Sequence, residues 1–347
     1  MLLTKRFAAP LGSLLLAVFL SGGAVAKTAT NPSAPGPQPN VVTQVTNGIL
    51  TLSIETISGQ FTVTTGASHP HPNANVLYPI GTSFITFRDA TALVMYTNTL
   101  GSVGSAGLAG YTTASMNQPS GFTTPLGTNG FRTVWPIPGG TWDITQDVIL
   151  NGTTLADTNV QQTITIQNIS TAPRQYGLRT MWDWYINGVD ASIFRTRNPD
   201  TAFTSNFITY SNPTFQIFEE VDDPTNPTFS VFGTIGGNAL SPAPTAPEQF
   251  RYSSWSAAAS NAWDFANTGG GIDSATEYYW GFATPLTLAA GASVSYTQYL
   301  TTQLSAVGGT PSGPLLVPTL SQWGMLVLMT LLAAAALCSV RRRGTRR

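Results

Sequence analysis

Apolar and polar residues alternate with a period of two along most of the chain from residue 41 onward. The alternation is clear in residues 49–54 and 60–64, and Ser58-Gly59 between them is typical of a hairpin turn. The same pattern predicts further strands at residues 82–88, 92–96, 141–150, 160–168, 176–186, 203–210, 214–220, 229–232, 277–283 and 292–304. Residues 254–265 form the one short helix that we expect before the C-terminal tail.

This series of short strands predicts an all-β fold. Thr, Ser, Val, Ile and aromatic residues dominate the strands, and 33 Gly and 24 Pro residues interrupt them at frequent turns. Such a pattern is typical of a large β-sandwich of two extended sheets. No change of composition divides residues 41–306, so we expect one domain there. Residues 27–40 have the composition of a linker and residues 307–316 that of a flexible stalk.

The first 26 residues have the three parts of a secretory signal peptide. Lys5 and Arg6 precede the apolar residues 11–20, and Ala24-Val25-Ala26 provides a cleavage site of small residues. A permanent N-terminal membrane anchor is the alternative. The apolar part is short for a membrane span, which favours cleavage after Ala26.

The C-terminal end has the pattern of a transmembrane helix. No charged residue occurs in residues 324–340, and a helix needs about 17 to 25 apolar residues to cross a bilayer. The membrane stop is Arg341, Arg342 and Arg343, which we expect to stay on the cytoplasmic side with the body outside. A buried C-terminal helix is the alternative, but such a helix rarely ends in clustered arginines.

A polar motif precedes this helix: Val317-Pro318-Thr319-Leu320-Ser321-Gln322-Trp323-Gly324. Residues 317–347 resemble the IPTL-CTERM sorting signal, which is similar to the PEP-CTERM tails of Gram-negative bacteria. Val317 stands where Ile is usual, and Gln322 stands where Glu is common. The resemblance implies that the protein is exported and that an exosortase-type enzyme, its expected partner, cleaves it near the motif. It leaves two locations open. The protein is either held in the inner membrane with its body in the periplasm, or processed to the cell surface or extracellular matrix.

The charge of the body differs from that of the whole chain. The chain has 15 Lys and Arg against 16 Asp and Glu, and seven of the 15 lie in the two terminal signals. Eight positive residues therefore face 16 negative ones, a net charge of −8, which argues against nucleic acid as a partner. The sole cysteine, Cys338, lies in the predicted membrane helix. The body therefore has no disulfide and depends on its core.

Residues 176–190 are the richest in chemically versatile side chains. On a strand, Leu178, Thr180, Trp182 and Trp184 share one face, and Arg179, Met181, Asp183 and Tyr185 share the other. The spacing of Gly177, Arg179, Asp183, Gly188 and Asp190 resembles that of uncharacterised secreted proteins of a supersandwich-like, carbohydrate-handling type. We predict glycan contacts from six residues: Arg179, Trp182, Asp183, Trp184, Tyr185 and Asp190. The alternative is a core strand that carries one buried ion pair.

An acidic stretch offers a second kind of site. Glu219, Glu220, Asp222 and Asp223 lie close together in sequence, and clustered carboxylates suit calcium, which prefers six to eight oxygen ligands. The alternative is a solvated acidic turn. No other cofactor is predicted.

His69-Pro70-His71 contains both histidines of the chain. An extended segment would direct the two imidazoles to opposite sides, which is a poor geometry for one metal ion. The sequence contains no Gly-x-Ser-x-Gly elbow, phosphate-binding loop or dinucleotide fingerprint.

These observations predict an exported, sorted surface or matrix protein that contacts polysaccharide without catalysis. One alternative is a secreted carbohydrate-active enzyme, a hydrolase or lyase, that uses Asp183 or Asp190 with another carboxylate. Another is a purely structural surface protein without a ligand.

Overall fold

A computed structural model describes residues 42–99, 103–117 and 123–309. The predicted signal peptide, the linker and the sorting segment lie outside these ranges, as does most of the predicted stalk. In the described ranges, no helix is both long and apolar enough to cross a membrane.

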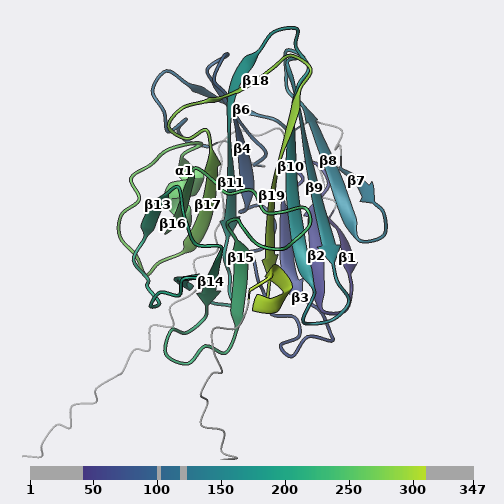
Figure 1. Cartoon of the computed structure of the whole chain (residues 1–347), viewed down its shortest axis with the longest axis vertical. Helices are drawn as coiled ribbons and strands as arrows, with labels where there is room; N and C mark the ends of the chain where they lie inside the picture. Colours follow the sequence, from purple (N-terminus) through teal and green to yellow (C-terminus); the bar gives the residue numbers. More distant parts are fainter. Residues whose placement is uncertain (1–41, 100–102, 118–122, 310–347) are drawn as a thin grey trace, which may run out of the picture.

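The strands form one small sheet and two large ones (Figure 1). The small sheet consists of β1 (Val42–Thr46), β2 (Leu50–Glu55) and β3 (Phe61–Thr65). Sheet I has the order β12 (Ile193–Arg197), β14 (Ile217–Val221), β15 (Ser230–Thr234), β19 (Ser293–Thr301), β10 (Asn159–Asn168), β9 (Trp142–Asn151), β8 (Gly130–Pro136) and β7 (Thr123–Leu126).

Sheet II completes the sandwich. Its order is β13 (Ile208–Ser211), β16 (Gln249–Ser254), β17 (Ser274–Trp280), β11 (Arg174–Asp183), β4 (Phe84–Asp89), β5 (Val94–Thr97) and β6 (Thr112–Ser115), and β18 (Leu286–Leu288) pairs with β11. The helix α1 (Trp255–Ser260) follows β16, and the 3₁₀ helix η1 (Leu304–Val307) follows β19. The expected all-β sandwich is therefore confirmed.

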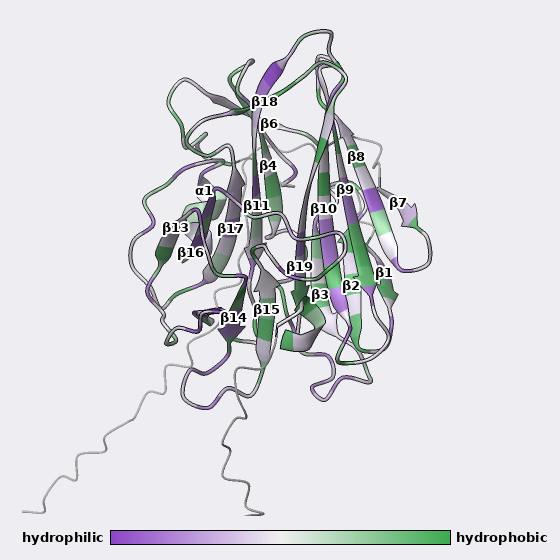
Figure 2. Ribbon diagram, in the orientation of Figure 1, coloured by the Kyte–Doolittle hydropathy of each residue, from purple (hydrophilic) through white to green (hydrophobic). Residues whose placement is uncertain are grey.

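Sheet I shows why the period-two pattern predicts its strands. In β9, Trp142, Ile144, Gln146, Val148 and Leu150 are buried, and the residues between them are partly exposed. One face of the strand therefore packs on the core and the other faces outward. Figure 2 shows hydrophobic and hydrophilic residues interspersed along these strands.

A chain of buried polar groups crosses the core and links its layers. The Trp182 Nε1 donates to Gln162 Oε1 at 2.9 Å, and Gln162 Nε2 donates to Gln146 Oε1 at 2.9 Å. Gln146 Nε2 donates in turn to the carbonyl of Gly59 in the β2–β3 turn, at 2.7 Å. Because a buried polar group without a partner is costly, this chain favours one alignment of sheet II, sheet I and the small sheet.

Sheet II is buried on both faces at its centre, and every residue of β4, β16 and β17 is buried. Its outer face packs against α1 and the segment that follows, in a second apolar cluster that contains Met181, Ala258, Trp263 and Tyr279. The predicted helix is present but ends at Ser260.

Several strands differ from the predicted set. The pattern gave no signal for β16, which is buried on both faces. It also did not predict the edge strands β1, β6, β7 and β12, which are four or five residues long, or the strands β8 and β18. Of the predicted strand at 203–210, only the end forms β13 (Ile208–Ser211).

Candidate functional site

Strand β11 has the two faces that the sequence predicts. Trp182 and Trp184 lie in the core between the sheets, where their rings meet edge to face at 5.8 Å between centroids. Both are fully buried, and Trp184 Nε1 donates to Thr276 Oγ1 at 3.0 Å. The two indoles are therefore structural in this arrangement and present no surface on which a sugar ring could stack.

Arg179 lies on the opposite face of β11 and is also fully buried. Its guanidinium donates to the carbonyls of Ala258 at 2.9 Å, Asn261 at 2.5 Å and Ala262 at 3.1 Å. Arg179 thus holds the end of α1 against sheet II. Tyr185 is half-buried, and its ring meets that of Tyr78 edge to face at 4.9 Å.

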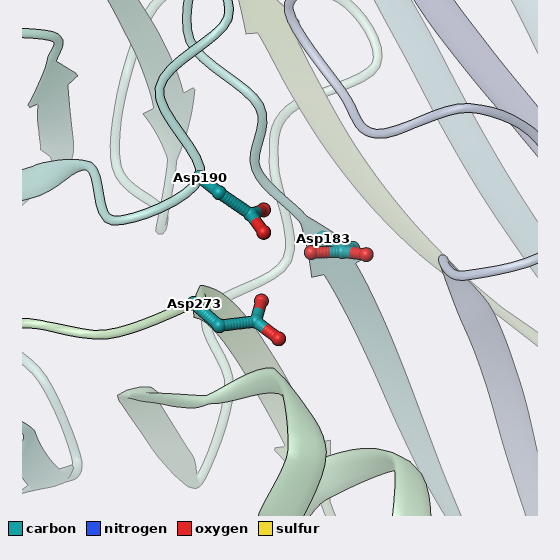
Figure 3. A group of neighbouring side chains, drawn as sticks. All are labelled: Asp183, Asp190 and Asp273. Atoms are coloured by element: carbon teal, nitrogen blue, oxygen red, sulfur yellow. The ribbon is translucent and has the colours of Figure 1, made fainter. Parts of the chain in front are cut away.

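Three carboxylates converge at the end of β11: Asp183, Asp190 and Asp273 (Figure 3). One oxygen from each lies within 4.8 Å of the others. The Ser274 N–H donates to the Asp190 carbonyl at 2.9 Å, and this bond holds the loop beside β17. Oxygen ligands in this arrangement suit a hard divalent cation.

Asp183 and Asp190 were both among the predicted site residues, and a tight turn brings them together. Asn187 and Gly188 adopt left-handed backbone conformations, with φ of 50° and 90°, and Ile186 pairs with Val189 across them. Asp273 was missed because it is distant in sequence and lies in a loop without a recognisable motif.

The four carboxylates of the predicted calcium site do not meet. Glu219 and Glu220 are consecutive residues of β14, so their side chains point to opposite faces of sheet I. Asp222 accepts from the N–H groups of Thr228 and Phe229, at 3.0 and 3.1 Å. Asp223 caps the same loop by accepting from the Thr225 N–H at 2.7 Å.

Glu220 instead enters a buried network between the sheets. The Ser192 hydroxyl donates to its carboxyl group and lies 2.6 Å from the Ser274 hydroxyl. Tyr252 OH donates to the Ser192 carbonyl at 2.6 Å. Burial raises the pKa of Glu220 to about 8, with further increases from the nearby Glu277 and Asp183, although the Ser192 hydrogen bond opposes the shift. Glu220 is therefore mostly protonated at neutral pH.

A cavity of about 610 Å³ lies over the β12–β14–β15 end of sheet I. Arg195 and Arg197 project from one face of β12, and Glu219 stands directly across from Arg195 in the sheet. Arg195 Nε and Nη2 both contact Glu219 Oε2 at 2.6 Å. Arg197 Nη1 lies 3.1 Å from Asp200 Oδ2 and 3.5 Å from Glu219 Oε2. Phe229, Phe232 and Leu304 supply the apolar lining.

Both histidines line this cavity, contrary to the expected opposite orientations. Their rings pack on the same side chain, Phe229, with centroids 5.7 and 5.6 Å away. The segment is a turn rather than an extended strand, because the His69 N–H donates to the Gly66 carbonyl and the Thr65 hydroxyl donates to the His71 carbonyl. The sequence features that could have indicated this site are the histidine pair and the two arginines Arg195 and Arg197, which lie two residues apart on one strand.

Comparison with known proteins identifies the tail and gives only distant structural likenesses for the body. Residues 317–344 match the IPTL-CTERM motif, which confirms the predicted resemblance and marks the chain as an exported, sorted protein of the cell envelope. No curated protein matches the chain.

The body is distantly similar to galactose mutarotase-like sandwiches. A galactose mutarotase-like protein from Lactobacillus casei aligns with 75% of this chain and 99% of its own, at 11% identity and a TM-score of 0.44. A galactose mutarotase related enzyme from Lactobacillus acidophilus aligns with 78% of this chain and 100% of its own, at 9% identity and a TM-score of 0.43. A copper-containing benzylamine oxidase from Hansenula polymorpha aligns with 85% of this chain and 66% of its own, at 9% identity and a TM-score of 0.42. These likenesses carry no information on ligand or activity.

Proposed function

We propose that this protein is displayed at the cell surface or in the extracellular matrix, where it binds polysaccharide without catalysis. The observation that supports the proposal is the cavity beside β12, in which guanidinium and carboxylate groups stand next to an apolar lining. A sugar ring has the same two kinds of surface, with hydroxyl groups at its rim and C–H groups on its faces. Ligand sites commonly combine an apolar wall with a few polar groups that fix orientation.

Binding to the exopolysaccharide of the producing organism tests the proposal. We expect the purified full-length protein to co-sediment with the polysaccharide, and we expect Arg195→Gln to weaken this binding. Arg132→Gln is a matched control. Arg132 forms an ion pair with Asp147 on the adjacent strand of sheet I, at 2.7 Å, but does not line the cavity. Equal losses in both variants, or no binding by the wild type, would contradict the proposal.

The location of the protein is tested by its intact mass in membrane, surface and medium fractions. We expect the surface or medium form to lack residues 1–26 and the tail beyond about Val317, because the motif resembles a processed sorting signal. An intact tail found only in the membrane fraction would mean that the protein stays anchored with its body in the periplasm.

A carbohydrate-active enzyme is the second candidate, and the convergence of Asp183, which is fully buried, with the partly exposed Asp190 favours it. Two facing carboxyl groups can act as general acid and as base or nucleophile in glycoside cleavage. Release of reducing sugar from the polysaccharide, abolished in a folded Asp183→Asn variant, would support this function over simple binding.

A further inference from the structure

The charges at the cavity beside β12 are balanced within the cavity itself. Two guanidinium groups, from Arg195 and Arg197, face two carboxylates, from Glu219 and Asp200. Glu219 lies between the two arginines and contacts both, and its side chain is only 6% exposed. The arginines are therefore already paired before any ligand enters.

His69 adds no positive charge to the wall of the cavity at neutral pH. Burial lowers the pKa of His69, so its imidazole is neutral at neutral pH. The His71 N–H donates to His69 Nδ1 at 3.0 Å, Nδ1 also lies 3.3 Å from the His71 carbonyl, and Nε2 lies 3.0 Å from the Thr302 hydroxyl. His69 is thus a neutral hydrogen-bonding group of the cavity wall.

We infer that the cavity selects uncharged sugars over uronic acids, an inference that rests on the proposed saccharide binding. A sugar hydroxyl both donates and accepts, so neighbouring hydroxyls can accept from an arginine and donate to the adjoining carboxylate without disturbing the ion pairs. A uronate only accepts at its carboxylate. It would meet Glu219 and Asp200 as like charges and would have to displace one of them from its arginine.

The lining residues outside the ion pairs also suit an uncharged ligand. Ser230 and Gln303 line the same cavity and carry neutral groups that donate and accept hydrogen bonds. Phe229 and Leu304 offer apolar surface to the C–H face of a sugar ring. Selectivity in this arrangement comes mainly from Glu219, since it contacts both arginines, whereas Asp200 contacts Arg197 only.

The test is an array of neutral oligosaccharides and of uronic acid counterparts with the same linkages, probed at neutral pH with the full-length protein. We expect the wild type to retain neutral members. Glu219→Gln frees Arg195 and leaves Arg197 paired with Asp200 alone. We expect this variant to gain affinity for uronates by about tenfold or more, the size of one charge-assisted hydrogen bond. Asp147→Asn, which frees Arg132 away from the cavity, should leave the selectivity unchanged.

Asp200→Asn is the second variant, because Glu219 is buried and its replacement could impair folding. The Asp200 side chain is 36% exposed, and its removal should shift selectivity toward uronates in the same direction but less. Preferential retention of uronates by the wild type, or no gain of uronate binding in either variant, would overturn the inference while leaving saccharide binding intact. Retention of no saccharide at all would instead refute the proposed function.

Discussion

Replacing Glu220 by Gln tests the buried network that joins the two sheets. The Glu220 side chain is fully buried, and its pKa rises from 4.5 for an exposed glutamate to about 8 in the folded protein. Gln has nearly the same shape as a protonated Glu and can still accept a hydrogen bond from Ser192. The substitution therefore removes the titration and keeps the packing.

The expected magnitude follows from the difference between the two pKa values. Between pH 4.5 and pH 8 the folded protein retains the Glu220 proton, whereas the unfolded chain has lost it. The stabilisation is complete below pH 4.5 and is lost as the pH rises, by about 1.4 kcal/mol per pH unit. From pH 5 to pH 8 the wild type should therefore lose about 4 kcal/mol that Glu220→Gln does not lose.

Urea unfolding of both proteins at pH 5, 6, 7 and 8 measures this difference. Glu277, whose pKa burial raises to about 7, titrates in both proteins. The effect of its burial therefore cancels in the comparison, and only its charge interaction with Glu220 is absent from the variant. Glu248→Gln is the control for the loss of a carboxyl group at a partly exposed position. This variant should keep the decrease of unfolding free energy with pH that Glu220 produces. If Glu220→Gln has the pH dependence of the wild type, Glu220 is not a protonated buried group.

Two further predictions concern packing. Trp182→Ala should lower the free energy of unfolding by about 3–5 kcal/mol, because it leaves a cavity and breaks the hydrogen bond to Gln162; urea unfolding with an unchanged midpoint would refute its place in the core. Gly59→Ala should destabilise much more than Gly188→Ala in the same measurement. Both glycines have positive φ, but a Cβ at Gly59 would lie 2.6 Å from Thr133 Oγ1, whereas one at Gly188 would meet nothing within 4 Å. Equal losses would show that backbone strain alone sets the cost.

Local sequence patterns predicted strands reliably where one face of the strand is exposed to solvent. The alternation in β9 and β10 and the turn at Asn187-Gly188 could be predicted because each depends on neighbouring residues only. The alternation in β11 placed its side chains on the correct faces, yet it could not tell which face packs on sheet I. Trp182 and Trp184 were therefore predicted as glycan contacts, although they lie in the core.

The groupings of charged residues could not be predicted in this way. Neighbours in sequence, Glu219 and Glu220, separate to opposite faces of a strand, whereas Asp273 joins Asp183 and Asp190 across a long stretch of chain. The calcium prediction failed to find this group because it assumed that closeness in sequence means closeness in space.

The sequence alone determined the sorting motif of this protein and its class of fold. A sorting motif is read as a linear segment, and the two-residue period of a strand follows from backbone geometry. Only the tertiary structure decided that Arg195, Arg197, Glu219 and His69 share one cavity. Such a site depends on strand order and register, which long-range packing of the two sheets fixes and no local pattern encodes.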